Sequence, residues 1–219
     1  MKRYMIALTF GIVSVSGALS GQAPSPAPAE AAAVPVVPGQ TLRDEHAVIE
    51  EVLGLATQEA KHLRKTKQLE RGRVAMMAAF FKGFADQCHH AKEEHYLFPA
   101  LEAAGDEATH KLIMQLMVQH EEGRAHIRAI IAAVKAWGVN EEIAAKDAAL
   151  HLDGYVKLLR NHIKKENKEL LPRVARLPDE AQQALAAAFD KVEREEMGGG
   201  THAQFEQMVE ELKASPPKK

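Results

Sequence analysis

A histidine followed four residues later by a glutamate occurs twice in equivalent surroundings, and this repeat constrains the fold more than any other feature. His89 and Glu93 form the first pair, and His162 and Glu166 form the second, 73 positions further on. In an α-helix, side chains four positions apart lie on the same face, one turn apart, so an imidazole and a carboxylate can approach one ion. The sequence therefore predicts two helices that together can hold two metal ions.

The repeat extends beyond these two pairs. At the same offset, Lys92, Leu97 and Pro99 recur as Lys165, Leu170 and Pro172. A single His–Glu pair would be weak evidence, because the same spacing also occurs at His46/Glu50, His90/Glu94 and His202/Glu206. The shared flanking residues make chance a poor explanation for the two repeated copies.

A lone histidine precedes each copy by a similar interval. His46 lies 43 residues before His89, and His120 lies 42 residues before His162. We therefore expect two pairs of helices, each of which contributes one lone histidine and one His–Glu pair.

Composition limits the number of domains and the kind of partner. The chain has 219 residues, of which 46% are hydrophobic and 26% are charged, and this is sufficient for one buried core. The formal net charge is −2, and no stretch of basic residues alternates with aromatic ones. We therefore expect one main domain and no nucleic-acid partner.

The first 20 residues resemble a secretory signal peptide in their order of features. Lys2 and Arg3 precede an apolar stretch over 4–15, and small residues follow over 16–20. Cleavage is expected after Ala18, Ser20 or Ala23, which predicts a periplasmic or secreted protein. The alternative is an uncleaved membrane anchor, but the apolar stretch is shorter than the ~20 residues that span a bilayer. We expect no stable membrane insertion after cleavage.

Residues 21–40 are rich in alanine and proline and almost uncharged, which favours an extended linker. From Thr41 onward, apolar residues recur every three or four positions, as in amphipathic helices, and nothing is typical of a strand. Four long helices are expected, from Thr41, from 71–74 to about Gly105, over 106–137 and over 141–171. Pro99 and Pro172 are each expected to end or kink a helix.

These elements predict an all-α protein with an up-down-up-down four-helix bundle over 41–175. A further helical stretch over 179–197 and a short helix over 201–212 belong to a C-terminal extension, 176–214, which we expect to pack on the bundle.

The candidate metal ligands are the residues of the repeat: His46, His89, Glu93, His120, His162 and Glu166. Imidazoles and carboxylates without thiolates suit iron, manganese or zinc, and helical bundles often hold two ions bridged by carboxylates. The histidines could instead act as pH sensors. However, so many ionisable groups inside a bundle would be costly to bury without a cation. Six ligands do not saturate two six-coordinate ions, which leaves positions for water-derived bridges or for O2, NO or peroxide.

At these positions the chain resembles the hemerythrin-like HHE cation-binding proteins. The resemblance covers Thr41 to Pro172 and is carried by the segments HHAKEEHYLFPALE at 89–102 and NHIKKENKELLP at 161–172. It implies that the six candidate residues hold a non-haem di-iron centre.

The sequence departs from that of oxygen-carrying hemerythrins at two positions. The third helix of those carriers has two histidines four apart, whereas Arg124 follows His120 here. Their fourth helix uses an aspartate five residues after its histidine, whereas Glu166 lies four after His162. One nitrogen ligand is therefore missing, which argues against reversible oxygen carriage and for a more open, more reactive site.

Several neighbouring residues allow a functional and a structural interpretation. Glu50 is either a further ligand or a surface acid. His90 is expected to point away from His89. Tyr155 and His151 either form hydrogen bonds at the centre or belong to the core, and the only thiol, Cys88, is expected to be a small buried side chain. His202 and Glu206 lie outside the repeat and are treated as accidental.

Three functional classes remain open. The chain could bind a diatomic ligand or peroxide at an exported di-iron site, use that site as an enzyme, or store iron. No general acid or substrate pocket can be identified from the sequence, so no catalytic residue is assigned and binding ranks first. The sequence does not identify a protein partner.

Overall fold

The computed structural model describes residues 37–196 and 201–217. The expected signal peptide (1–20) and most of the expected linker (21–40) lie outside the described residues. Within the described residues, no helix is both long and apolar enough to cross a membrane.

The described part of the chain is helical and contains no strand, which confirms the predicted all-α class. The first helix, α1, spans Pro38–Thr66. It begins three residues before the expected Thr41, so the end of the predicted linker is helical instead. The reason is local: Pro38 has no backbone N–H to satisfy and a fixed φ, and both properties suit the first position of a helix.

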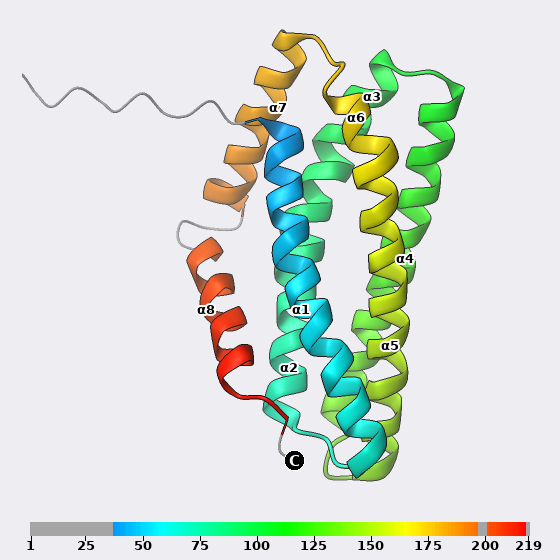
Figure 1. Ribbon diagram of the computed structural model, residues 1–219, viewed down its shortest axis with the longest axis vertical. Coiled ribbons are helices and arrows are strands. Elements are labelled where there is room, and N and C mark those ends of the chain that lie inside the picture. Colours follow the sequence, from blue (N-terminus) through cyan, green and yellow to red (C-terminus); the bar gives the residue numbers. More distant parts are fainter. Residues whose placement is uncertain (1–36, 197–200, 218–219) are drawn as a thin grey trace, which may run out of the picture. The chain divides into compact units, whose positions relative to one another are not determined.

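Two of the other three long helices of the bundle, the second and the fourth, contain π-helical segments. The second consists of α2 (Arg71–Phe80), η1 (Phe81–His90), η2 (Glu93–Leu97) and α3 (Phe98–Ala104). The third is α4 (Glu107–Ala136), and the fourth consists of α5 (Glu141–Lys165), η3 (Glu166–Leu170) and α6 (Leu171–Val174). Figure 1 shows that successive helices run in opposite directions. Helix α5 packs against α1 and α4, and α2 packs against α4.

Polar side chains start the third and fourth helices. The carboxylate of Asp106 accepts a hydrogen bond from the Thr109 amide (2.9 Å), and the side chain of Asn140 accepts one from the Ile143 amide (3.1 Å). Each bond satisfies an amide that has no partner within the helix. These caps explain why both helices begin where the sequence predicts.

The second helix continues past Pro99 to its expected end near Gly105, whereas the fourth continues past Pro172 and beyond its expected end at Leu171. The chain remains helical to Ala104 after Pro99 and to Val174 after Pro172. A π-helical turn precedes each proline: the Phe98 amide donates to the Glu93 carbonyl, and the Leu171 amide donates to the Glu166 carbonyl. The wider turn lets the helix continue past a residue that cannot donate.

A layer of polar side chains divides the apolar core into two clusters. In α1, His46 lies between Leu42 of the smaller cluster and Ile49 of the larger one. In α4, His120 lies between Leu116 and Ile127 in the same way. The bundle therefore buries its candidate ligands between two hydrophobic layers.

The C-terminal extension consists of α7 (Asp179–Lys191), η4 (Val192–Glu196) and α8 (Thr201–Ala214). It packs along the α1 and α2 side of the bundle (Figure 1). Phe189 joins the smaller core cluster, and Phe205 joins the larger one. Arg73 of α2 donates to the buried Glu59 of α1 (2.8 Å) and to the Leu212 carbonyl of α8 (2.6 Å). Apolar contacts and buried hydrogen bonds therefore both hold the extension.

The substitution Gly83→Ala tests the packing of α8. A Cβ atom at Gly83 would lie 2.5 Å from the Phe205 ring, so the variant should lose about 1–3 kcal/mol of unfolding free energy through overpacking. The matched control is Gly54→Ala in α1, where no atom lies within 4 Å of the added Cβ. That change should stabilise the protein by about 0.5–1 kcal/mol. Urea unfolding measures both, and equal stability of the two variants would contradict this packing.

Candidate metal centre

The structure brings all six sequence-predicted residues together in the polar layer. His46 comes from α1, His89 and Glu93 from η1 and η2, His120 from α4, and His162 and Glu166 from α5 and η3. Each is at most 2% exposed. Four helices therefore direct nitrogen and oxygen atoms into one water-excluded volume.

One half of the cluster, which we call site A, contains His46, His89, Glu93 and Glu166. The Nε2 atoms of His46 and His89 lie 3.1 Å apart. Glu166 Oε2 is 3.1 Å from the Nε2 of His46, and Glu93 Oε1 is 3.7 Å from the Nε2 of His89. These four atoms are close enough to surround a single cation.

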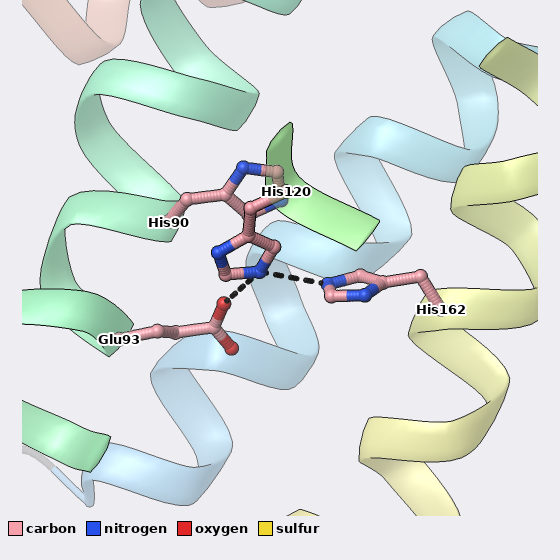
Figure 2. A group of neighbouring side chains, drawn as sticks. All are labelled: His90, Glu93, His120 and His162. Atoms are coloured by element: carbon pink, nitrogen blue, oxygen red, sulfur yellow. Dashed lines mark hydrogen bonds and ion pairs between the residues drawn. The ribbon is translucent and has the colours of Figure 1, made fainter. Parts of the chain in front are cut away.

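The other half, site B, contains His90, Glu93, His120 and His162 (Figure 2). The Nε2 atoms of His120 and His162 lie 3.2 Å apart. Glu93 Oε2 is 3.5 Å from the Nε2 of His120, and Glu166 Oε1 is 3.0 Å from the Nε2 of His162. Both glutamates therefore present one oxygen to site A and the other to site B.

His90 does not point away from the cluster, which corrects the expectation from the sequence. It is 3% exposed, and its ring stacks on that of His120 with 3.8 Å between centroids. The expectation assumed α-helical rotation, but His89 and His90 end a π-helical segment. A turn with i→i+5 hydrogen bonds holds more residues, so successive side chains are separated by a smaller rotation.

The repeat itself contains the signal that could have identified His90. The equivalent position in the second copy is Ile163, which is 4% exposed. An apolar residue at that position indicates that it faces the interior in both copies. A histidine in its place therefore had to be buried near the other ligands.

The outer nitrogens of the site A histidines face oxygen atoms. His89 Nδ1 is 2.8 Å from Glu45 Oε2, and His46 Nδ1 is 3.1 Å from Asn167 Oδ1. Because these oxygens only accept, each Nδ1 carries the proton and donates. Each Nε2 is then left with a lone pair directed inward, as metal ligation requires.

Site B repeats this arrangement with residues at equivalent positions. His162 Nδ1 donates to Gln119 Oε1 (3.0 Å), and His120 Nδ1 donates to Glu94 Oε1 (2.6 Å). Gln119 precedes His120 just as Glu45 precedes His46. In each site, therefore, one of these two hydrogen-bonded histidines is held by a carboxylate and the other by an amide.

The chemistry of the inward-facing atoms fits a cation. All four oxygens of Glu93 and Glu166 and both ring nitrogens of His90 are buried without a hydrogen-bond partner among the described residues. The facing Nε2 lone pairs also have no donor between them. Buried acceptors left in this state are destabilising, and metal ions bound among them would remove that penalty.

The electrostatics of the two glutamates support the same conclusion. Burial and the adjacent Glu166 carboxylate raise the pKa of Glu93 well above its usual value. Burial opposes ionisation of Glu166 too, but the imidazoles of His162 and His46 hold its pKa well below the usual value. The metal-free pocket thus favours one carboxylate charge over two, whereas bound cations would favour both.

Arg124, at the position of the histidine missing from the third helix, is a positioning residue. Its guanidinium bonds to the Glu94 carboxylate and to Asp86 Oδ1 (3.2 Å). Burial opposes ionisation of Glu94, but His120 and Arg124 lower its pKa to about 2. Arg124 thereby keeps charged the carboxylate that orients His120.

The other candidate residues lie outside the two sites. Glu50 pairs with Arg160 (3.3 Å), and His151 contacts His126 through their Nδ1 atoms (3.1 Å). The Tyr155 ring packs on Phe81 in the core, with 4.5 Å between centroids. Cys88 is buried, which raises the pKa of its thiol to about 11. Glu206 contacts neither site.

His202, treated from the sequence as accidental, lies near the centre. Its Nε2 is 3.9 Å from Glu45 Oε1, the carboxylate that orients His89. The sequence contains no periodic pattern that links α8 to this position.

Comparison with known proteins agrees with the geometry. The model of the hemerythrin HHE cation binding domain matches residues 37–174, and this chain belongs to that family. Proteins described as uncharacterized in Mycobacterium tuberculosis and Mycobacterium bovis are 24% identical over 208 residues, which covers 92% of this chain and 79% of each relative. No solved structure matches the chain. The family and the His/Glu clusters together define a metal-binding protein.

The substitution His90→Leu tests whether His90 is a ligand. It removes two buried nitrogens that have no hydrogen bond within the described residues and leaves only a 3.6 Å polar contact with Asp86 to be lost, so the metal-free protein should be at least as stable as the wild type. Metal binding should nevertheless weaken by at least about tenfold. Thermal melting of the metal-free protein and chelator competition measure the two effects. The exposed His95 on the same helix provides the control, His95→Leu, and equal affinities of both variants would exclude ligation by His90.

Proposed function

We propose that this protein holds a non-haem di-iron centre, with one iron in site A and one in site B, that interacts with O2, NO or peroxide. The observation that carries the proposal is the pair of buried glutamates, each of which presents one oxygen to each histidine group. Such carboxylates favour two ions close together over two separate sites. Nitrogen and oxygen donors without thiolate suit iron in this role.

The donor count distinguishes the two positions. Site A offers two histidines and an oxygen from each glutamate, whereas site B offers the same with the addition of His90. An octahedral ion in site A is therefore the one with more positions left for an external ligand. When bound, a pair of iron ions would supply the electrons for interaction with such a ligand.

His90 alters the conclusion drawn from Arg124, which stands where oxygen-carrying hemerythrins have a second histidine on the third helix. The third helix lacks a second histidine, but His90 on the second helix directs an imidazole to the same region. The total of five histidines then limits the open positions, which supports reversible binding over a broadly open reactive centre.

The rest of the chain positions the ligands and excludes water. The carboxylates of Glu45 and Glu94 and the amides of Gln119 and Asn167 fix the histidine rings, and two apolar clusters cover the polar layer. Small uncharged molecules are the ligands that such a buried site can admit most readily.

We also propose that the chain functions in an exported compartment, periplasmic or secreted. The support is the signal-like sequence of residues 1–20. N-terminal sequencing of the protein from the exported fraction tests this assignment, and a cytoplasmic location with an intact Met1 would contradict it.

Removal of the metal should destabilise the protein. At a metal concentration about 100 times the dissociation constant, binding contributes about 2.7 kcal/mol for each site. Elemental analysis of the protein as isolated should give about two irons per chain, with the visible absorption of a bridged ferric pair. Chelation should abolish the absorption and lower the melting temperature. One metal per chain, or zinc in place of iron, would contradict the proposed centre.

Reactivity distinguishes the proposal from the enzyme and storage alternatives. Anaerobically reduced protein should form spectral adducts with O2 or NO, and these adducts should disappear when the gas is removed. Catalytic consumption of peroxide or NO would instead favour an enzyme. Iron that is released readily and forms no adduct would favour storage. The Glu93→Gln variant is the control, since the loss of a bridging charge should abolish all three behaviours.

A further inference from the structure

We propose that the C-terminal extension tunes site A, because Glu193 of η4, whose side chain is 34% exposed, joins the buried charged groups Lys92 and Glu45 that set how strongly His89 holds its metal. This inference rests on the proposed metal centre. Residues 37–174 match the family domain, so Glu193 lies beyond the matched region.

The chain of contacts starts at a proposed ligand. His89 Nδ1 donates to Glu45 Oε2 (2.8 Å), and the other oxygen of Glu45 accepts a hydrogen bond from the Lys92 ammonium. Lys92 also donates to Glu193 Oε1 at 2.6 Å. The order is therefore imidazole, carboxylate, ammonium, carboxylate, and the last member belongs to the extension.

Burial gives these contacts their strength. The side chain of Lys92 is 0% exposed and that of Glu45 is 3% exposed. Burial alone would lower the pKa of Lys92, yet Glu45 and Glu193 raise it above its ordinary value. Phe189 of α7 adds a ring whose centroid is 5.9 Å from the ammonium. Two residues of the extension thus stabilise a cation that the bundle alone would leave with a single carboxylate.

The repeat provides an internal comparison. Lys165 occupies the equivalent position in the second copy, but it donates to Gln115 at the protein surface (2.8 Å). The histidine there, His162, donates to the neutral Gln119. The charged chain at His89 therefore has a neutral counterpart at the equivalent histidine, His162, whereas the charged contacts of site B are made to His120 through Glu94.

The physical consequence concerns the electron density at His89. A carboxylate that accepts the outer N–H of a ligand histidine increases the basicity of the inner nitrogen. Lys92 draws negative charge away from Glu45, and Glu193 partly neutralises Lys92. Without Glu193, the ammonium would act more fully on Glu45, so His89 would become a weaker donor. A more positive surrounding would also favour the reduced metal.

The test compares Glu193→Gln with Glu206→Gln in the full-length protein. Glu206 lines the same surface pocket as Glu193, whereas the ion pairs of Lys92 within the described residues are made to Glu45 and Glu193. Glu193→Gln should weaken the binding of Fe²⁺ to one of the two sites by severalfold and raise the reduction potential, whereas Glu206→Gln should match the wild type. Chelator competition and a redox titration measure these quantities. Equal values for both variants and the wild type would overturn the inference.

Two further variants separate a tuning role from a purely structural one. Glu45→Gln should weaken binding by about 10–100-fold. The double variant Glu45→Gln/Lys92→Met removes both buried charges, so it avoids an unpaired ion and should fold. In that background the further change Glu193→Gln should have no effect on affinity or potential. An undiminished effect there would mean that Glu193 acts by another route and would overturn the proposed chain.

The matched pair Lys92→Met and Lys165→Met uses the repeat as a control. The first should change the potential, and the second should not. Failure of this inference can be told apart from failure of the metal centre: wild-type protein that binds two irons, with variants that behave identically, contradicts only the role of the extension. Wild-type protein that binds no metal contradicts the proposed function itself.

Discussion

The structure depends on two buried glutamates whose oxygens have no hydrogen-bond partner among the described residues. Glu93 and Glu166 lie between two apolar clusters, where an unpaired acceptor is costly. Each directs one oxygen to either side, so their placement defines two positions for cations instead of one. The helices that carry them pass through a π-helical turn at each glutamate, which lets them continue beyond Pro99 and Pro172. Ligand placement and helix geometry are therefore linked.

Around this centre the two halves follow one plan with different charges. Glu45 and Gln119, which precede the lone histidines, each accept a hydrogen bond from a histidine of another helix. Asn167 and Glu94, which follow the two buried glutamates, each accept one from a lone histidine. Glu45 and Glu94 are charged and are each compensated by a cation, whereas Gln119 and Asn167 are neutral. The rings of His46, His89, His120 and His162 are thereby fixed by outer acceptors, an arrangement that suits a rigid metal site.

Membership of the hemerythrin HHE family explains the bundle and the ligand pattern but not the whole molecule. His90 adds an imidazole from the second helix, while Arg124 occupies the position from which the third helix could have supplied one. The C-terminal extension then contacts Lys92, so the surroundings of site A differ from those of site B. These features make this chain a distinct version of a common scaffold.

The sequence by itself determined the helical class and indicated six of the residues that meet in the polar layer, because a four-residue spacing places side chains on one helix face and the repeat makes chance a poor explanation. It also indicated where the third and fourth helices begin, although the capping roles of Asp106 and Asn140 were seen only in the structure. Only the tertiary structure decided the position of His90, the π-helical turns before the two prolines, and the link from Glu193 to His89. The π-helical turns change which side chains face inward, and the contact between residues 101 positions apart arises from packing. No local sequence pattern encodes either feature.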